Sequence, residues 1–173
     1  MMLKHTLAAA TFGVLFAAFS PAQAAIQSYT FNGAVDSGSL IGETYSGSFS
    51  FDDAALSGIA DEWLSVDNLA MSFMGSSYTQ ANVASGAAVE VGYQDGVFLG
   101  LSYSVDAVSI PFTFVAGYAD ASDAYFAYDN GAGVAGAGSV NYAPVPEPRS
   151  WMLILAGVGL VGMMVERSKR RRI

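Results

Sequence analysis

Between residues 26 and 143 the chain alternates apolar and polar residues over short stretches, and glycine, serine, asparagine or aspartate interrupts the pattern repeatedly. This two-residue period is typical of half-buried β-strands. No long segment follows the 3.6-residue period of an amphipathic helix. The alternation predicts strands around residues 29–34 and 45–51, and at 63–74, 76–80, 87–94, 97–105, 111–116, 123–128 and 137–142.

So many short strands in one segment predict a single all-β domain over residues 25–143, built as a β-sandwich of the jelly-roll or immunoglobulin-like type. The clearest hairpin has Asp95-Gly96 at its turn, because these residues accept the positive φ values of a type I′ turn. Residues 52–57 are expected to form one helical turn. The glycine-rich stretch 131–138 is expected to be a flexible loop.

The same segment carries no lysine, arginine or histidine, whereas it contains 13 acidic side chains between Asp36 and Asp129. A domain this acidic cannot neutralise phosphates, so nucleic acid is excluded as a partner. The chain has no cysteine and its one histidine is His5, which excludes the usual Cys/His zinc sites. Ser-His pairs, Cys-His pairs and a Schiff-base lysine are excluded in the domain for the same reason. An enzymatic role is therefore not expected.

Residues 1–24 have the three parts of a secretory signal peptide. Lys4 gives the amino end a positive charge, an apolar stretch runs from Leu7 to Phe19, and Ala22-Gln23-Ala24 forms an A-x-A cleavage site. The apolar stretch is shorter than the roughly 20 residues that a membrane span needs. We expect export through the translocon, followed by removal of this segment by signal peptidase.

A second apolar run, the 15 residues from Trp151 to Val165, predicts one transmembrane helix over 151–165. As a helix it is about 23 Å long, short of the roughly 30 Å hydrocarbon core, and flanking cationic side chains can extend it. Trp151 stands where an interfacial aromatic residue belongs. The basic tail 166–173 acts as a stop-transfer segment and places this end in the cytoplasm. Its basic residues are Arg167, Lys169, Arg170, Arg171 and Arg172.

The segment 144–173 combines three unlike elements in order: Val145-Pro146-Glu147-Pro148, then Trp151 with its short Gly/Ala/Leu-rich span, then the arginine cluster. In this it resembles the PEP-CTERM sorting signal of Gram-negative bacteria, over about a sixth of the chain. The commonest form has small polar residues before the tryptophan, where this chain has Arg149-Ser150. The two prolines of the motif restrict φ and hold Glu147 extended outside the membrane.

The resemblance implies that an exosortase-type membrane enzyme recognises the motif and cleaves near Pro146-Glu147-Pro148. It implies a protein anchored in the inner membrane and facing the periplasm before sorting. Afterwards the protein is expected at the cell surface or in the extracellular matrix of a Gram-negative-type bacterium. Substrates of this family occur in bacteria that make extracellular polysaccharide. A structural or adhesive role in a biofilm is therefore expected, with that polysaccharide as a candidate partner.

Carboxylates are the only charged side chains in the domain, which has 13 of them. Oxygen-only ligands suit Ca²⁺, and the adjacent pairs Asp52-Asp53 and Asp61-Glu62 are candidates for a weak extracellular calcium site. Neither pair matches the EF-hand spacing, and a solvated acidic surface is the alternative. A glycosidase needs two carboxylates about 5–9 Å apart, so these four residues and Glu90 are formal candidates for that remote alternative. No other cofactor is expected.

The aromatic residues leave a further alternative open, a carbohydrate-binding surface module, because a flat ring can stack on the apolar face of a sugar. The competing interpretation, which strand periodicity favours, places them in the core of the domain. Alternation also predicts that Phe126 and Tyr128 face one side of their strand and Tyr125 the other, with one side buried. The candidate sugar-binding residues are Trp63, Tyr93, Tyr103, Tyr118, Tyr125, Tyr128 and Tyr142.

Overall fold

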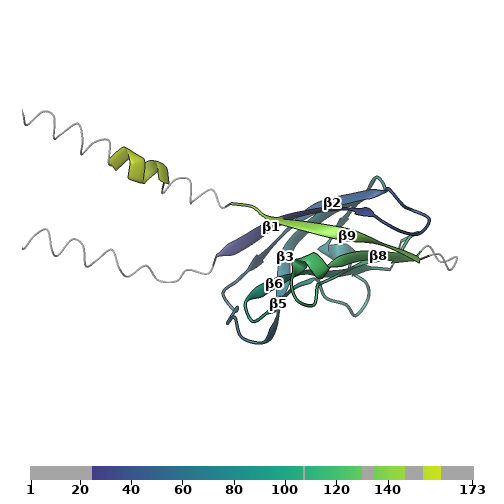
Figure 1. Ribbon diagram of the computed structural model, residues 1–173, viewed down its shortest axis with the longest axis horizontal. Coiled ribbons are helices and arrows are strands. Elements are labelled where there is room, and N and C mark those ends of the chain that lie inside the picture. The colour runs from purple at the N-terminus through teal and green to yellow at the C-terminus, as the bar shows by residue number, and fades with distance from the viewer. Residues whose placement is uncertain (1–24, 107, 130–134, 147–153, 161–173) are drawn as a thin grey trace, which may run out of the picture.

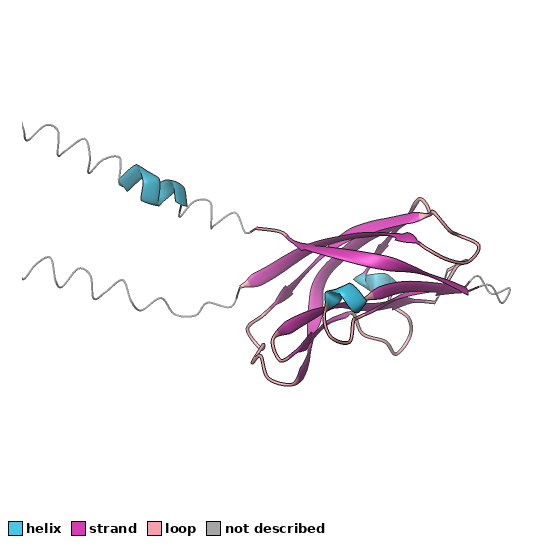
Figure 2. Ribbon diagram, in the orientation of Figure 1, coloured by secondary structure: helices cyan, strands magenta, loops and turns pink. Residues whose placement is uncertain are grey.

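The computed structural model describes residues 25–106, 108–129, 135–146 and 154–160. Antiparallel β-strands joined by turns and loops make up most of it, as Figure 1 and Figure 2 show. Two short 3₁₀ helices, η2 (Gln80–Asn82) and η3 (Ala121–Asp123), interrupt the strands. The strands are β1 (Ile26–Val35), β2 (Thr44–Asp52), β3 (Asp61–Phe73), β4 (Ser76–Thr79), β5 (Glu90–Gln94), β6 (Val97–Val105), β7 (Phe112–Val115), β8 (Tyr125–Asp129) and β9 (Ala135–Pro144).

The strands form a ring rather than two separate sheets. The order of hydrogen-bonded neighbours is β2-β1-β9-β8-β7-β6-β5-β3-β4, and β2 also pairs with β3. This last pairing closes eight strands into an antiparallel barrel, with β4 as one extra strand on β3. The prediction of an all-β domain is confirmed. The predicted two-sheet sandwich is replaced by a barrel because β2 pairs along both of its edges.

β3 changes neighbours halfway along its length. Residues 61–65 pair with β5, and residues 66–73 pair with β2. The register between β2 and β3 skips Asp67, so this residue is the extra one of a β-bulge. The bulge shifts the alternation of inward and outward positions. The buried residues of the strand are therefore Leu64, Val66, Leu69, Met71 and Phe73.

Two local predictions are wrong. The sequence predicts a helical turn at 52–57, but Asp52 ends β2 and the Leu56 amide closes a turn onto the Asp53 carbonyl. The stretch 131–138 is not all loop, because its second half belongs to β9 and pairs with β8. Alternating glycine and alanine suit this strand, since short side chains leave room for large rings on the neighbouring strands. The first half of the stretch lies outside the described residues.

Aromatic rings fill the interior of the barrel. The rings of Tyr45 and Phe126 stack with centroids 4.3 Å apart, and Phe31 meets Phe114 edge-on at 5.2 Å. The Tyr45 hydroxyl donates a hydrogen bond to the Ser139 carbonyl at 2.6 Å, which satisfies a polar group that burial would otherwise make costly. The largest fully buried side chains are Tyr45, Tyr103, Phe31, Phe51, Phe73, Phe114 and Phe126.

Between the strand ends, the outer wall of the barrel is uncharged over β1, β2 and the part of β3 that follows the bulge. Its outward residues are serine, threonine, asparagine and alanine, and they form cross-strand pairs such as Thr30 with Ser48 and Ser50 with Asn68. Apart from Asp67 at the bulge, acidic residues lie where strands begin or end, or in the segments that connect strands. They are Asp36, Glu43, Asp52, Asp53, Asp61, Glu62, Glu90, Asp95, Asp106, Asp120, Asp123 and Asp129.

The chain enters and leaves the barrel at the same end (Figure 1). We call this the tether end: it comprises the start of β1, the end of β9, the loop 53–60 and the turn 95–96. β9 continues to bond to β1 as it leaves, because the Val145 amide donates to the Ser28 carbonyl at 2.7 Å. The opposite end, which we call the far end, includes the connection 36–43 between β1 and β2.

Residues 154–160 form a short helix with exposed side chains. They are the described part of the span predicted at 151–165, and the rest of that span lies outside the described residues. In the described part of the chain, no helix has the length and apolar character needed to cross a membrane. The predicted signal peptide 1–24 and the basic tail 166–173 also lie outside the described residues.

Candidate functional site

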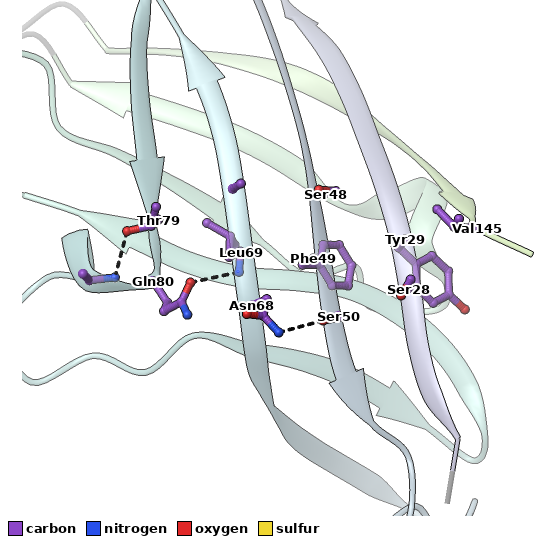
Figure 3. A pocket seen from close by; sticks show the side chains of 12 residues that line it. Ser28, Tyr29, Ser48, Phe49, Ser50, Asn68, Leu69, Thr79, Gln80 and Val145 are labelled. Atoms are coloured by element: carbon purple, nitrogen blue, oxygen red, sulfur yellow. Dashed lines mark hydrogen bonds between the residues drawn. The ribbon is translucent and has the colours of Figure 1, made fainter. Parts of the chain in front are cut away.

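A shallow groove of about 690 Å³ crosses the outer wall over β1, β2 and β3 and reaches η2 (Figure 3). The outward-facing side chains of Ser28, Ser48, Ser50 and Asn68 contribute to its surface. Val145, which directly follows β9, also lines it. None of the twelve described residues that line this groove carries a charge.

The Gln80 side chain forms one side of the groove and hydrogen-bonds to the β3 backbone as a neighbouring strand would. Its Oε1 accepts a hydrogen bond from the Leu69 amide at 2.9 Å, and its Nε2 donates to the Asp67 carbonyl at 3.0 Å. Along β3, the pairing with β5 stops at Ser65 and the pairing with β4 starts only at Ala70. The backbone between these two residues needs other hydrogen-bond partners on this edge, and Gln80 provides them. One amide side chain therefore satisfies the backbone at the gap that the bulge leaves.

The local sequence holds Gln80 in place. Thr79 precedes η2 as its N-cap, and the Thr79 hydroxyl accepts a hydrogen bond from the Ala81 amide at 3.3 Å. The Asn82 side chain accepts from the Thr79 amide at 2.9 Å, which completes a capping box. Sequence analysis missed this site, although Thr79 and Asn82 have capping-box spacing.

The groove offers hydrogen-bond donors and acceptors without charge. Asn68 Nδ2 donates to Ser50 Oγ at 3.3 Å, and the serine hydroxyls can donate or accept as a ligand requires. No base or acid is among the lining residues, so nothing in the groove activates a serine as a nucleophile. The arrangement suits binding of a polar, uncharged ligand.

The first predicted carboxylate pair holds backbone at the tether end. Asp52 Oδ1 accepts a hydrogen bond from the Ala54 amide at 2.8 Å. The Asp53 carboxylate accepts from the Ala25 amide at 3.0 Å and from the Gln27 side chain at 2.8 Å. Both residues thus stabilise the loop after β2 and the start of β1.

The second pair does the same on the other side of that loop. Gln94 Nε2 donates to Asp61 Oδ1 at 2.9 Å, which joins β5 to β3. The two oxygens of Glu62 accept from the amides of Ser57 and Gly58, each at 2.7 Å. Hydrogen bonding from Ser57, followed by that from Gly58, lowers the pKa of Glu62. Glu62 is therefore a loop anchor in its charged form.

The structure brings both pairs to one end of the barrel, but each carboxylate has its own backbone or amide partners. Within the described residues, no group of three or more acidic or histidine side chains could hold a metal ion. Glu90, the fifth candidate for carboxylate catalysis, begins β5 opposite Ser65 and Ser102. Gln94, at the other end of β5, is the residue beside Asp61.

The candidate sugar-binding aromatics divide between the core and the surface. Trp63 is 50% exposed and Tyr118 is 84% exposed. Phe126 is buried and Tyr125 is exposed, which confirms the predicted two-sided strand. Trp63 lies over β5, where a Cβ added to Gly92 would be 3.0 Å from the indole ring. The candidate aromatics that lie in the core or pack against it are Tyr93, Tyr103, Tyr128 and Tyr142.

The predicted sorting motif is described at its first two residues. Val145 is 42% exposed and keeps its backbone bond to β1, and Pro146 follows it. The remaining predicted sorting, stop-transfer and cleavage residues lie outside the described residues. These are Glu147, Pro148, Trp151, Arg167, Lys169, Arg170, Arg171 and Arg172, together with Ala22 and Ala24.

Comparison of the chain with protein-family models, curated proteins and solved structures finds no match.

Proposed function

We propose that this chain is an exported envelope protein, sorted through a PEP-CTERM signal by an exosortase-type enzyme, with a structural or adhesive role linked to extracellular polysaccharide. The observation that carries the proposal is the junction between barrel and motif. Pro144 ends β9, the Val145 amide still bonds to Ser28, and Pro146-Glu147-Pro148 follows at once. The barrel thus ends where the proposed recognition motif begins.

In this proposal residues 1–24 direct export, residues 25–143 form the barrel, and residues 144–173 anchor and sort it. The barrel faces the periplasm from the inner membrane before sorting and reaches the cell surface or matrix afterwards. Its role is not catalytic. Aromatic rings fill the barrel interior, which supports a structural or surface-binding role over that of a carrier for a small ligand.

The test is the intact mass of the protein from membrane and extracellular fractions of the native host. The wild type is compared with a variant that carries Pro146→Ala, Glu147→Ala and Pro148→Ala. Loss of the C-terminal span in the wild type but not in the variant is the expected result. A matched control, Arg149→Ala, leaves the motif intact and is expected to be processed. An intact tail in every form would contradict sorting.

A second candidate, binding of a neutral polysaccharide in the groove, is favoured by a lining that carries no charge and combines hydroxyl and amide groups with apolar surface. A neutral glycan offers matching donors and acceptors, and the 13 acidic residues of the domain repel an anionic one. In this second candidate, the groove is the surface through which the protein adheres to polysaccharide.

Affinity electrophoresis in gels that contain a neutral or an anionic polysaccharide tests the second candidate. Ser48→Glu places a charge in the groove and is expected to abolish retardation by the neutral polymer. Ser72→Glu, exposed on the same wall but outside the groove, is the matched control and should leave it unchanged. Equal retardation of both variants and the wild type would exclude the groove as the binding surface.

A further inference from the structure

Exposed apolar side chains gather at the tether end. Ile59 in the loop 53–60 is 73% exposed, Trp63 is 50% exposed, and Val97 beside the turn 95–96 is 46% exposed. Ile26 and Val145, where the chain enters and leaves the barrel, are also exposed. The far end presents Ile41 and Met74. The larger number of exposed apolar side chains at this end of an acidic domain makes it a candidate contact surface.

The loop that carries Ile59 is held on both sides. Glu62 binds the amides that precede Ile59, those of Ser57 and Gly58. Ala60, which follows Ile59, donates its amide to Asp95 Oδ1 at 2.9 Å, and its carbonyl accepts from the Asp95 amide at 3.0 Å. The loop and the turn 95–96 are therefore tied together.

The backbone of this loop is also under strain. Ala60 has φ of 60°, a left-handed conformation that a residue with a Cβ adopts at a cost. The Asp95 bonds keep Ala60 in this conformation and leave the Ile59 side chain outside the barrel. Hydrogen bonds between the loop 53–60 and the turn 95–96 thus hold Ile59 and Val97, the first residue of β6, as a preformed apolar edge.

The sequence places this edge close to the predicted membrane span. Trp151 comes six positions after Val145, a length of at most about 20 Å when the chain is extended. Val145 itself is bonded to β1, so the connecting segment starts at the barrel surface. With an anchor of this length, the tether end is the part of the barrel nearest the bilayer.

We infer that the tether end rests on the lipid surface, with Ile59 and Val97 in the interfacial region and the Trp63 indole at headgroup level. This inference rests on the proposed membrane anchor. Tryptophan suits such a depth because its ring is apolar and its N–H can bond to water or headgroups. The same end carries Asp52, Asp53, Asp61, Glu62 and Asp95, so the partner is a zwitterionic lipid surface and anionic headgroups weaken the contact.

The experiment uses the full chain in vesicles of phosphatidylcholine and phosphatidylethanolamine. Trp151→Phe leaves Trp63 as the one tryptophan, since the chain has 2. Lipids brominated near the headgroup end of the acyl chain are expected to quench Trp63 emission, and its maximum is expected to shift to the blue. Adding phosphatidylglycerol should reduce both effects, and raising the salt concentration should restore them.

Two further variants make the result specific. Ile59→Ser with Val97→Ser, in the Trp151→Phe background, should reduce the quenching of Trp63. Ile41→Trp in a chain with Trp63→Phe and Trp151→Phe places the single tryptophan at the far end, where no quenching is expected. A chain that floats with the vesicles but leaves Trp63 unquenched would overturn this inference and leave the anchor standing. A chain that does not float would overturn both.

Discussion

The Tyr142 hydroxyl accepts a hydrogen bond from the Leu101 amide at 3.1 Å, although β7 and β8 separate their strands in the ring. The ladder between β6 and β7 ends at the pair of Tyr103 and Phe114, two residues short of Leu101. The tyrosine crosses the barrel interior and supplies the partner that the ladder lacks. A side chain thus completes the wall where strand pairing stops.

Replacing Tyr142 by phenylalanine keeps the ring and removes the acceptor. The Leu101 amide then loses its partner in a half-buried position, so we expect the free energy of unfolding to fall by about 1–3 kcal/mol. Urea denaturation measures the change. Tyr118→Phe removes a hydroxyl from a residue that is 84% exposed and should leave stability unchanged. Equal values for the two variants would contradict the role given to Tyr142.

Gln80→Ala removes both bonds from the side chain to the β3 backbone. Because part of this edge can be reached by water, we expect a loss of about 1–2 kcal/mol rather than the full cost of two buried groups. Hydrogen exchange should show faster exchange at the Leu69 amide. Ser46→Ala, on the exposed face of β2, is the control. An unchanged rate at Leu69 would mean that Gln80 does not protect it.

Gly33→Ala is expected to destabilise the barrel because there is no room for a Cβ. Such an atom would lie 2.5 Å from the Tyr45 ring and would press on the Ser139 carbonyl oxygen. Overpacking of this kind costs about 1–3 kcal/mol and often more when backbone is one of the contacts. Thermal unfolding of Gly33→Ala beside Asn32→Ala, an exposed neighbour on β1, checks the expectation. A similar melting temperature for both would contradict it.

Glu62 makes the loop 53–60 sensitive to acid. Its pKa is lowered in the folded chain, chiefly by the hydrogen bond from Ser57, so the folded state binds the proton less tightly than the unfolded state. Its contribution is complete above the ordinary value of about 4.5 and is lost as the pH falls through the lowered value. Glu62→Gln should therefore weaken the pH dependence of stability between the ordinary and the lowered pKa of Glu62. An identical acid profile for both proteins would contradict this.

Alkaline pH acts on the buried tyrosines in the opposite sense. Burial raises the pKa of Tyr103 and of Tyr142 to about 12 from 10.0. The folded state thus holds these protons more tightly, and the resulting stability is complete below about pH 10 and lost as the pH rises toward 12. Tyrosinate absorbance and near-UV circular dichroism should change together. Ionisation of all tyrosines in a folded barrel would contradict this burial.

Local sequence predicts the strands well where alternation is uninterrupted. β6 has the predicted bounds 97–105. Asp95 and Gly96 have φ of 49° and 79°, which confirms the predicted type I′ turn. These features depend on neighbouring residues, so a short window of sequence contains the information. The bulge at Asp67 is also a local feature. The apolar residues alternate up to Val66 and resume at Leu69, shifted by one position.

Closure of the barrel could not be predicted in this way. It depends on Tyr45 pairing with Phe73 and on Tyr29 pairing with Pro144, and these partners are far apart in the sequence. Alternation says which face of a strand is buried, but it does not say which strands become neighbours. The groove was missed for the same reason, since its serines on β1 and β2 and its Asn68 on β3 meet through these pairings. Gln80 lies in η2, outside the strands, so the alternation of apolar and polar residues gives no information about its role.

The position of β9 has a mechanical consequence. This strand lies between β1 and β8 and leads directly to the C-terminal segment. Its hydrogen bonds run across the direction in which that segment leaves. A pull on the segment therefore loads the bonds on both sides of β9 together, in shear, instead of peeling them off one after another. The barrel can therefore carry tension through its last strand.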